Sequence, residues 1–349
     1  MILTTIVLSV ALTAQNQGAQ PITAAAFKPA AVTITPKRTF SDASVIQIAP
    51  APKGSIFAAS TIDSKIRIYD AKYSKMIIEL GDHPQPVYAL AWSPDGRYMA
   101  SGDESARIFI WKTEDWSLWR QYRSHQRGIQ QLDFNAQSTM LISTGKDDMI
   151  KLWDLRSSKK GPARDYPGMG AMYMGARWIG ATEKFGVGIL SYGAREYSGA
   201  TGSLLGFFPT KQSVQDVDYR PDGKLMAAGG RDGNISVWNP AKRVRLATMK
   251  GHEGWIWHLR FSPNGKLLAS SADDRTIRIW DAVTYQPVMT IPNQASFGSP
   301  LSWTADGKYL LTVNVGEVLQ THTVSPEQSA PPVKPLKPVK KKAKPRKKR

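Results

Sequence analysis

The segment TIRIWD (276–281) completes one strand of a unit that recurs along the chain. Its counterparts are KIRIYD (65–70), RIFIWK (107–112), IKLWDL (150–155) and NISVWN (234–239). Apolar residues in these segments alternate with polar or charged ones, as is typical of a half-exposed β-strand. The recurrence therefore predicts a repeat protein whose unit contains this strand.

The aromatic residue near the end of each segment sets the repeat length. In chain order these residues are Tyr69, Trp111, Trp153, Tyr197, Trp238 and Trp280. They are separated by 42, 42, 44, 41 and 42 residues, and a further 42 residues lead to His322. A period of about 40–45 residues with four short strands per unit predicts the blades of a β-propeller. Seven units can be counted, and the unit around Tyr197 departs most from the pattern.

A tight turn lies fifteen residues before the aromatic position in five of the units. The turns are Pro52-Lys53-Gly54, Pro94-Asp95-Gly96, Pro221-Asp222-Gly223, Pro263-Asn264-Gly265 and Asp306-Gly307. Pro presets φ for a turn, and Gly supplies the positive φ that a tight hairpin requires. An apolar strand precedes each turn and a strand of small residues follows it, so each unit is expected to contain antiparallel hairpins.

The last unit predicts how the ring closes. It supplies three strands, SPLSW (299–303), YLLTVN (309–314) and VLQTHTV (318–324), and a Pro-rich segment follows them. Pro donates no hydrogen bond to a sheet, so a fourth strand is not expected there. The unused segment VTITPKR (32–38) can complete the blade and remove the open edges. We expect an all-β, seven-bladed propeller of four-stranded antiparallel blades over residues 32–324, closed by an N-terminal strand.

Unit six, GHEGWIWHLRFSPNGKLLASSADDRTIRIWD (251–281), resembles the WD-repeat β-propeller family nearly throughout. Members of that family lock each blade with a hydrogen-bonded tetrad of His, Asp, Ser or Thr, and Trp. The resemblance implies two complete tetrads: His252, Asp274, Ser270 and Trp280 in unit six, and His125, Asp147, Ser143 and Trp153 in unit three. Unit two has His83, Ser101 and Trp111, but Ser105 stands where the resemblance places the Asp.

The resemblance also implies a partner-binding face that carries the loops between the second and third strands of the blades. The residues seven positions before the aromatic positions should lie there, together with Trp255. This set comprises Ile62, Glu104, Lys146, Arg231, Asp273, Val315 and Trp255. It mixes both charge signs with apolar groups and includes Trp and Arg, which are good interface anchors. We therefore predict a protein or peptide partner, although solvated loops would give the same composition.

The composition argues against several chemistries. The chain has no Cys, which excludes disulfides and thiolate sites, and its five His show no metal-ligand spacing. The tetrads contain Ser, His and Asp, but their recurrence with Trp in separate units favours a structural role over catalysis. We predict no catalytic residue, metal, cofactor or small-molecule substrate. An enzyme would need carboxylates or His converging in the central channel, and the sequence identifies none.

The N-terminal residues suggest a cellular location. The first 14 residues, MILTTIVLSVALTA, carry no charge, and they are too few for a transmembrane helix of about 20 residues. They predict a secretory signal peptide within residues 1–19, cleaved after Ala14 or near Ala19, and a flexible leader over residues 20–31. The protein is then expected to be exported to the periplasm or the extracellular space. The alternative is a nuclear or cytoplasmic protein with an apolar N-terminus.

The C-terminus is strongly basic. Residues 325–349 contain ten Lys or Arg residues, all within Lys334–Arg349, and one acid, Glu327, in a chain of net charge +18. Like charges separated by Pro predict a disordered tail that attaches to anionic polymers or membranes, or that merely keeps the protein soluble. The run KKKAKPRKKR (340–349) also resembles a nuclear localisation signal. We expect a non-enzymatic protein-binding scaffold, or alternatively an intracellular platform held on nucleic acid by this tail.

Overall fold

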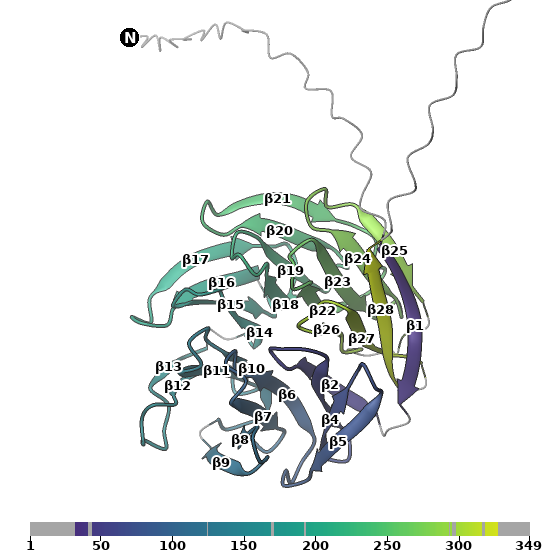
Figure 1. Cartoon of the computed structure of the whole chain (residues 1–349). Coiled ribbons are helices and arrows are strands. Elements are labelled where there is room, and N and C mark those ends of the chain that lie inside the picture. Colours follow the sequence, from purple (N-terminus) through teal and green to yellow (C-terminus); the bar gives the residue numbers. More distant parts are fainter. Residues whose placement is uncertain are drawn as a thin grey trace, which may run out of the picture.

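The computed structural model describes residues 32–40, 44–123, 125–168, 171–191, 193–292, 294, 298–315 and 318–326. These residues form seven four-stranded antiparallel sheets, arranged as blades around a central channel (Figure 1). The predicted seven-bladed propeller is therefore confirmed, including the blade around Tyr197. The predicted signal peptide, the leader and the basic tail after Pro326 lie outside the described residues.

Each of the first six blades takes its four strands from one continuous stretch of chain. Blades one to three consist of β2 (Val45–Pro50), β3 (Ile56–Thr61), β4 (Ile66–Asp70), β5 (Lys75–Leu80), β6 (Val87–Trp92), β7 (Tyr98–Asp103), β8 (Arg107–Lys112), β9 (Leu118–Arg123), β10 (Ile129–Phe134), β11 (Met140–Gly145), β12 (Ile150–Asp154) and β13 (Arg164–Tyr166).

Blades four to six consist of β14 (Tyr173–Trp178), β15 (Lys184–Ile189), β16 (Gly193–Ser198), β17 (Leu204–Pro209), β18 (Val214–Tyr219), β19 (Met226–Gly230), β20 (Ile235–Asn239), β21 (Val244–Met249), β22 (Ile256–Phe261), β23 (Leu267–Ala272), β24 (Ile277–Asp281) and β25 (Pro287–Ile291). In every blade the first strand lies at the channel and the fourth lies at the rim.

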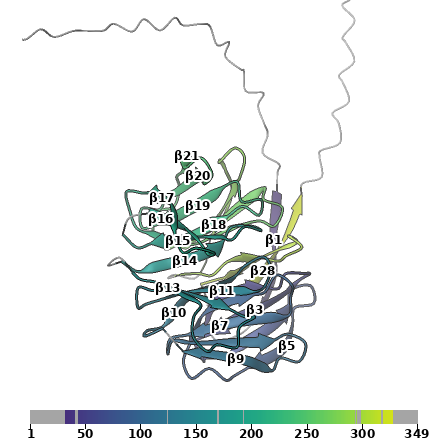
Figure 2. The ribbon, with the colours of Figure 1, turned by 90° about the vertical axis from the view of Figure 1, so that its left-hand side faces the viewer.

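The seventh blade joins the two ends of the fold. Its strand order is β26 (Ser302–Trp303), β27 (Tyr309–Val313), β28 (Leu319–Pro326) and β1 (Val32–Phe40). Figure 2 shows β1 beside β28, and their register runs from Val32 opposite Pro326 to Phe40 opposite Leu319. The ladder shifts register between Pro36 and Arg38, consistent with a Pro that has no N–H to donate. Closure by an N-terminal strand is confirmed, and β28 extends two residues beyond the predicted position 324.

Side-chain size changes from the inner strands to the rim. Every residue of β19 and β23 is buried, and these strands have the sequences MAAGG and LLASSA. Small side chains allow neighbouring blades to pack closely there, because a blade's second strand is covered on both faces. By contrast, most residues of the outer strands β5 and β21 are exposed. The core is thus divided among the interfaces between adjacent blades.

Hydrogen bonds between blades fix the inner ring. The indole N–H of Trp92 donates to the carbonyl of Ala49 at 3.0 Å, and that of Trp303 donates to the carbonyl of Arg260 at 3.0 Å. Each bond joins the end of one blade's first strand to the preceding blade. The Gly of each predicted turn has a φ of 68–77°, as a tight hairpin requires: Gly54, Gly96, Gly223, Gly265 and Gly307.

Candidate functional site

The tetrads predicted for blades three and six form continuous hydrogen-bonded chains. In blade six, the Ser270 hydroxyl accepts from Trp280 Nε1 at 2.8 Å and lies 2.7 Å from His252 Nε2, while His252 Nδ1 lies 2.8 Å from Asp274. The carboxylate orients the Nδ1–H, so Nε2 accepts the hydroxyl proton. Burial alone would raise the pKa of Asp274, but hydrogen bonds from His252 and Thr276 outweigh it and hold this pKa far below its usual range.

Blade three repeats this arrangement. The Ser143 hydroxyl accepts from Trp153 Nε1 at 2.9 Å and lies 2.7 Å from His125 Nε2, and His125 Nδ1 lies 2.9 Å from Asp147. Neither Ser hydroxyl is exposed to solvent, because Ser143 and Ser270 are completely buried. A hydroxyl enclosed in this way cannot reach a substrate. The geometry fits a structural lock that joins two strands to the loop before the blade.

Blade two obtains its carboxylate from a position that the sequence comparison missed. Ser105 stands at the expected Asp position, but it donates to Asp103 at 2.8 Å instead of contacting His83. Asp103 is completely buried and lies 2.9 Å from His83 Nδ1, and the remaining bonds run through Ser101 to Trp111. The sequence feature that could have revealed this carboxylate is an acid two residues before the expected position, at the final residue of β7.

The other blades replace parts of the tetrad. In blade seven, Thr312 lies 2.9 Å from His322, with the ten-residue offset that separates Ser and Trp in the complete locks. In blade five this offset places Ala228 beside Trp238, whose buried indole N–H has no hydrogen-bond partner among the described residues. Blade four packs Tyr197 against other aromatic rings, with Phe185 stacked on it at 5.6 Å. These substitutions explain why the periodicity survives where the motif does not.

The partner-binding residues predicted from the sequence lie around one end of the channel. We call this end the upper mouth; it is where the first strands of the blades begin. A cavity of about 500 Å³ opens there, and Ile62 and Lys146 line it together with Tyr88 and Trp257. Ile62 is 55% exposed, whereas Lys146 is half-buried and bonds Glu104 at 2.6 Å. The upper mouth therefore combines an exposed apolar group with a paired cation.

An aromatic pair extends this rim over blades five and six. Trp255 lies 5.6 Å from Trp257 between ring centroids, and the Arg231 guanidinium lies 5.4 Å from the Trp255 ring. The indole N–H of Trp257 donates to Asp273 at 2.6 Å, and the backbone N–H of Asp273 donates to the Trp255 carbonyl at 2.9 Å. The remaining residue of the set, Val315, is 54% exposed. The structure thus brings Arg231, Trp255 and Asp273 together at one position.

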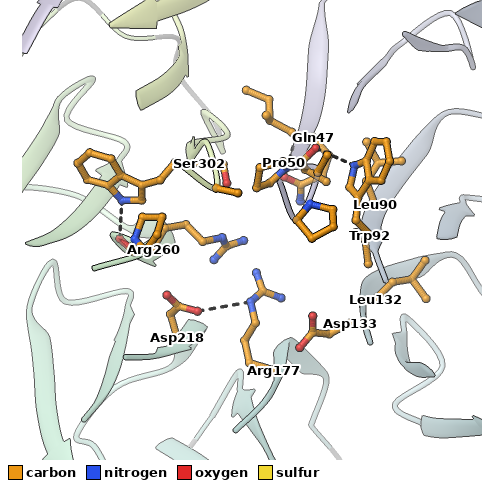
Figure 3. Close-up of a pocket in the computed structure, with 18 of the residues that line it drawn as sticks. Gln47, Pro50, Leu90, Trp92, Leu132, Asp133, Arg177, Asp218, Arg260 and Ser302 are labelled. Carbon is orange, nitrogen blue, oxygen red and sulfur yellow. Dashed lines mark hydrogen bonds and ion pairs between the residues drawn. The ribbon is translucent and has the colours of Figure 1, made fainter. Parts of the chain in front are cut away.

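The opposite end of the channel holds a charged cluster that the sequence reasoning did not find. We call this end the lower mouth; its cavity of about 340 Å³ is lined by Asp133, Arg177, Asp218 and Arg260, among others (Figure 3). These four residues occupy the same position in the first strands of four consecutive blades, with acids and bases alternating. Figure 3 shows both guanidinium groups directed into the cavity. In the sequence, this cluster could have been found from the charged residue at the fifth position of each of these first strands.

The carboxylates of this region also connect neighbouring blades. Asp133 accepts the backbone N–H of Trp178 at 2.7 Å, and Asp218 accepts that of Phe261 at 2.7 Å. Deeper in the channel, Asp216 accepts from the Arg260 guanidinium at 2.5 Å. Asp133 and Asp218 thus each accept a hydrogen bond from a backbone N–H of the next blade, and Asp216 pairs with the guanidinium of Arg260.

Burial dominates the titration of the two acids at the lower mouth. It raises the pKa of Asp133 to about 6 and that of Asp218 to about 6, although Arg177 and Arg260 oppose the change. Burial and the charge of Arg260 lower the pKa of His258 to about 4. At neutral pH His258 is therefore uncharged. Carboxylates do converge in the channel, and each of the two acids at the lower mouth is hydrogen-bonded to a neighbouring blade.

The described residues contain neither a metal-binding cluster nor a membrane-spanning helix. Within the described ranges, no three His, Cys, Asp or Glu side chains gather as a possible metal site. In the same part of the chain, no helix has the length and hydrophobicity needed to cross a membrane.

The fold and its locks define a class, a closed propeller whose blades are held by buried Trp–Ser–His–Asp chains. The family model for the WD domain, G-beta repeat, matches residues 74–112, 116–154, 202–239 and 243–281. The chain belongs to the WD-repeat β-propeller family. Each match begins near the outer strand of one blade and ends with the third strand of the next.

Curated relatives share the repeats over part of their length. The chain is 30% identical over 188 residues to the nuclear distribution protein nudF of Aspergillus niger, covering 50% of this chain and 40% of the relative. It is 31% identical over 179 residues to the nuclear distribution protein PAC1 of Fusarium vanettenii (51% and 32%). It is 33% identical over 119 residues to a poly(A)+ RNA export protein of Schizosaccharomyces pombe (33% and 34%). The chain thus spans two fifths or less of these relatives.

These relatives contradict the expected export of the protein. Their names refer to nuclear distribution and to RNA export, which are processes inside the cell. The expectation rested on the apolar character of residues 1–14 alone. An uncharged run of this length has the hydrophobicity of a signal peptide but lacks the basic residues that normally precede one, so it was a poor indicator of destination.

Proposed function

We propose that this protein is an intracellular, non-enzymatic scaffold that binds a protein partner over the upper mouth. The observation that supports this proposal is the grouping of Arg231, Trp255 and Trp257 beside a cavity of about 500 Å³. Trp and Arg are the side chains that most often dominate binding energy at protein interfaces. The cavity is large enough to receive a side chain of the partner.

The character of this rim favours a protein over a polyanion. Asp273 and Glu104 stand among the cations, and each is held by a neighbour, Trp257 or Lys146. A polyanion would meet these acids with repulsion, whereas a folded partner or a peptide can match both charge signs. The intracellular location is part of the proposal, and the names of the relatives support it.

The decisive experiment targets the aromatic rim. A photo-crosslinking residue placed at Ile62, which is 55% exposed, should trap the partner in cells of the source organism. Trp255→Ala should weaken capture about tenfold or more, since loss of an anchor costs about 2 kcal/mol. The matched control is Leu246→Ala on the outer strand β21, where the side chain is 45% exposed. Equal capture by the two variants would rule out the upper mouth as the binding site.

A second candidate function rests on the composition of residues 325–349. Ten cations and one acid within 25 residues are expected to bind nucleic acid or another polyanion through counterion release. The competing explanation, a solubilising segment, predicts no such binding at about 0.15 M salt. Retention on immobilised heparin, compared between the full chain and a chain ending at Pro326, distinguishes the two. Equal retention would remove this candidate and leave the upper-mouth proposal intact.

The intracellular location has its own test. Mass spectrometry of the mature protein should find peptides from residues 1–14, because nothing is then cleaved during export. A mature chain beginning at Gln15 or Gln20 would overturn the location without affecting the binding surface.

A further inference from the structure

A third cavity lies on the rim, far from the channel mouths. Its volume is about 690 Å³, and strand β9 of blade two forms one side with Trp119, Arg120 and Arg123. The loop between β12 and β13 of blade three forms the other side with Lys159 and Lys160. We call this cavity the rim groove, and Figure 1 shows β9 and β13 on adjacent blades.

The groove is held open by contacts across the two blades. The Arg120 guanidinium donates to the carbonyl of Ser157 at 2.6 Å, which ties the blade-three loop to β9. It also donates to the Tyr122 hydroxyl at 3.2 Å, and the buried Tyr122 ring stacks on Trp153 at 4.6 Å between centroids. The wall is therefore built on the core of blade three and is a fixed part of the fold.

The rim groove is lined by positive charge. Its lining contains four cations, Arg120, Arg123, Lys159 and Lys160, and no acid. Two other cations of blade three are already neutralised, since Lys151 pairs with Asp165 at 3.0 Å and Arg156 pairs with Asp154 at 2.9 Å. Among the described residues, no ion pair within 4.0 Å joins a groove cation to a carboxylate. Such a concentration of cations attracts a polyanion.

Flat side chains lie in the same groove. Trp119 stacks on Tyr98 with centroids 4.4 Å apart and planes inclined by 18°, and the Arg120 guanidinium lies 4.1 Å from the Trp119 ring. Nucleic-acid bases stack on aromatic rings and on guanidinium planes, whereas sulfated sugars and inorganic polyphosphate have no flat group to offer. A guanidinium plane held in place by Trp119, beside three further cations, therefore favours nucleotides over other anionic polymers.

We propose that the rim groove binds single-stranded nucleic acid. A base would stack on the outer face of the Arg120 guanidinium, because Tyr98 and Arg120 occupy the two faces of the Trp119 ring. The phosphates would follow Arg123, Lys159 and Lys160. A single strand fits better than a duplex, because paired bases are already stacked on each other and cannot stack on the guanidinium plane. This site is independent of the upper mouth and of the basic tail, and it would allow the scaffold to hold a protein and a nucleic acid together.

The test uses the full chain, so that the tail contributes equally to every measurement. Fluorescence anisotropy measures binding of a labelled single strand of about 12 nucleotides, in RNA and DNA forms. K159E/K160E should weaken binding roughly tenfold or more and lower the salt slope by about 1.4, corresponding to two lost phosphate contacts. The matched control is K242E/K266E, which changes the charge equally at two exposed lysines of blades five and six.

Arg120→Lys separates stacking from charge. It keeps the positive charge but removes the planar group, so oligonucleotide affinity should fall while heparin affinity stays unchanged. Equal losses in K159E/K160E and K242E/K266E would show that binding lies outside the groove and would overturn the proposal. A loss of both ligands in K159E/K160E with no effect of Arg120→Lys would mark a general polyanion site, and that result would also overturn it.

Discussion

Replacing Ser270 by Ala tests whether the hydroxyl at the centre of the tetrad carries the lock of blade six. The hydroxyl accepts from Trp280 Nε1 at 2.8 Å and bonds His252 Nε2 at 2.7 Å, and Ser270 is completely buried. Its removal leaves one donor and one acceptor without partners in a site that water does not reach. At about 1–3 kcal/mol for each unpaired buried group, the expected loss of unfolding free energy is about 2–6 kcal/mol.

Blade five offers the reciprocal change. Trp238 carries a buried indole N–H without a partner among the described residues, and Ala228 stands ten residues before it, at the position of Ser270 relative to Trp280. Ala228→Ser supplies the missing acceptor to a single donor. We expect stabilisation by about 1 kcal/mol, the usual net value of one hydrogen bond.

Urea unfolding followed by Trp fluorescence measures both changes through the midpoint at constant slope. The control is Ser158→Ala at an exposed site, which should stay within about 0.5 kcal/mol of the parent protein. A Ser270→Ala variant as stable as the control would refute the lock. An Ala228→Ser variant that loses stability would also refute the lock, because a Ser hydroxyl at the equivalent position would then stabilise blade six but destabilise blade five.

Three further predictions concern other parts of the ring. Asp103→Ala should cost about 2 kcal/mol or more in urea unfolding, whereas Ser105→Ala should cost less, since only the former leaves a buried His without its carboxylate. Burial lowers the pKa of His322 from 6.5 to about 4. The contribution of His322 to the unfolding free energy is therefore complete above pH 6.5 and declines by about 3 kcal/mol as the pH falls through 4. His322→Gln should flatten this decline, measured as the urea midpoint across the same pH range. Deleting residues 1–31 should leave cooperative unfolding intact, whereas deleting 1–40 removes β1 and should cause aggregation by light scattering.

Much of the fold was predictable because the same strand and turn pattern recurs from blade to blade. The aromatic spacing and, in five units, the turn glycine depend on local chemistry. The aromatic spacing therefore persists even where a blade has lost both its tetrad and its turn glycine, as at Tyr197. Closure was predictable because three strands in the last unit left one segment, 32–38, to complete a sheet. The cellular location was not predictable from the hydrophobicity of residues 1–14, because that run lacks the basic residues that normally precede the apolar region of a signal peptide.

The sites were harder to predict because they depend on side chains that meet across blades. Asp133, Arg177, Asp218 and Arg260 are 41 to 44 residues apart in sequence, and they converge only because each is the fifth residue of a channel strand. Asp103 was missed for a different reason. A carboxylate two residues earlier, on the last residue of β7, can still reach His83, and a fixed motif position does not allow for that tolerance.

The pairing of β1 with β28 has a consequence for synthesis on the ribosome. Val32 pairs with Pro326, so the two strands emerge 294 residues apart, which at about 5–20 residues per second corresponds to roughly 15–60 seconds. During that interval the first six blades can form in order while β1 waits without its partner. The emerging chain must therefore carry an unpaired strand for most of its translation, and chaperone binding to nascent chains should concentrate on β1 until β28 is released.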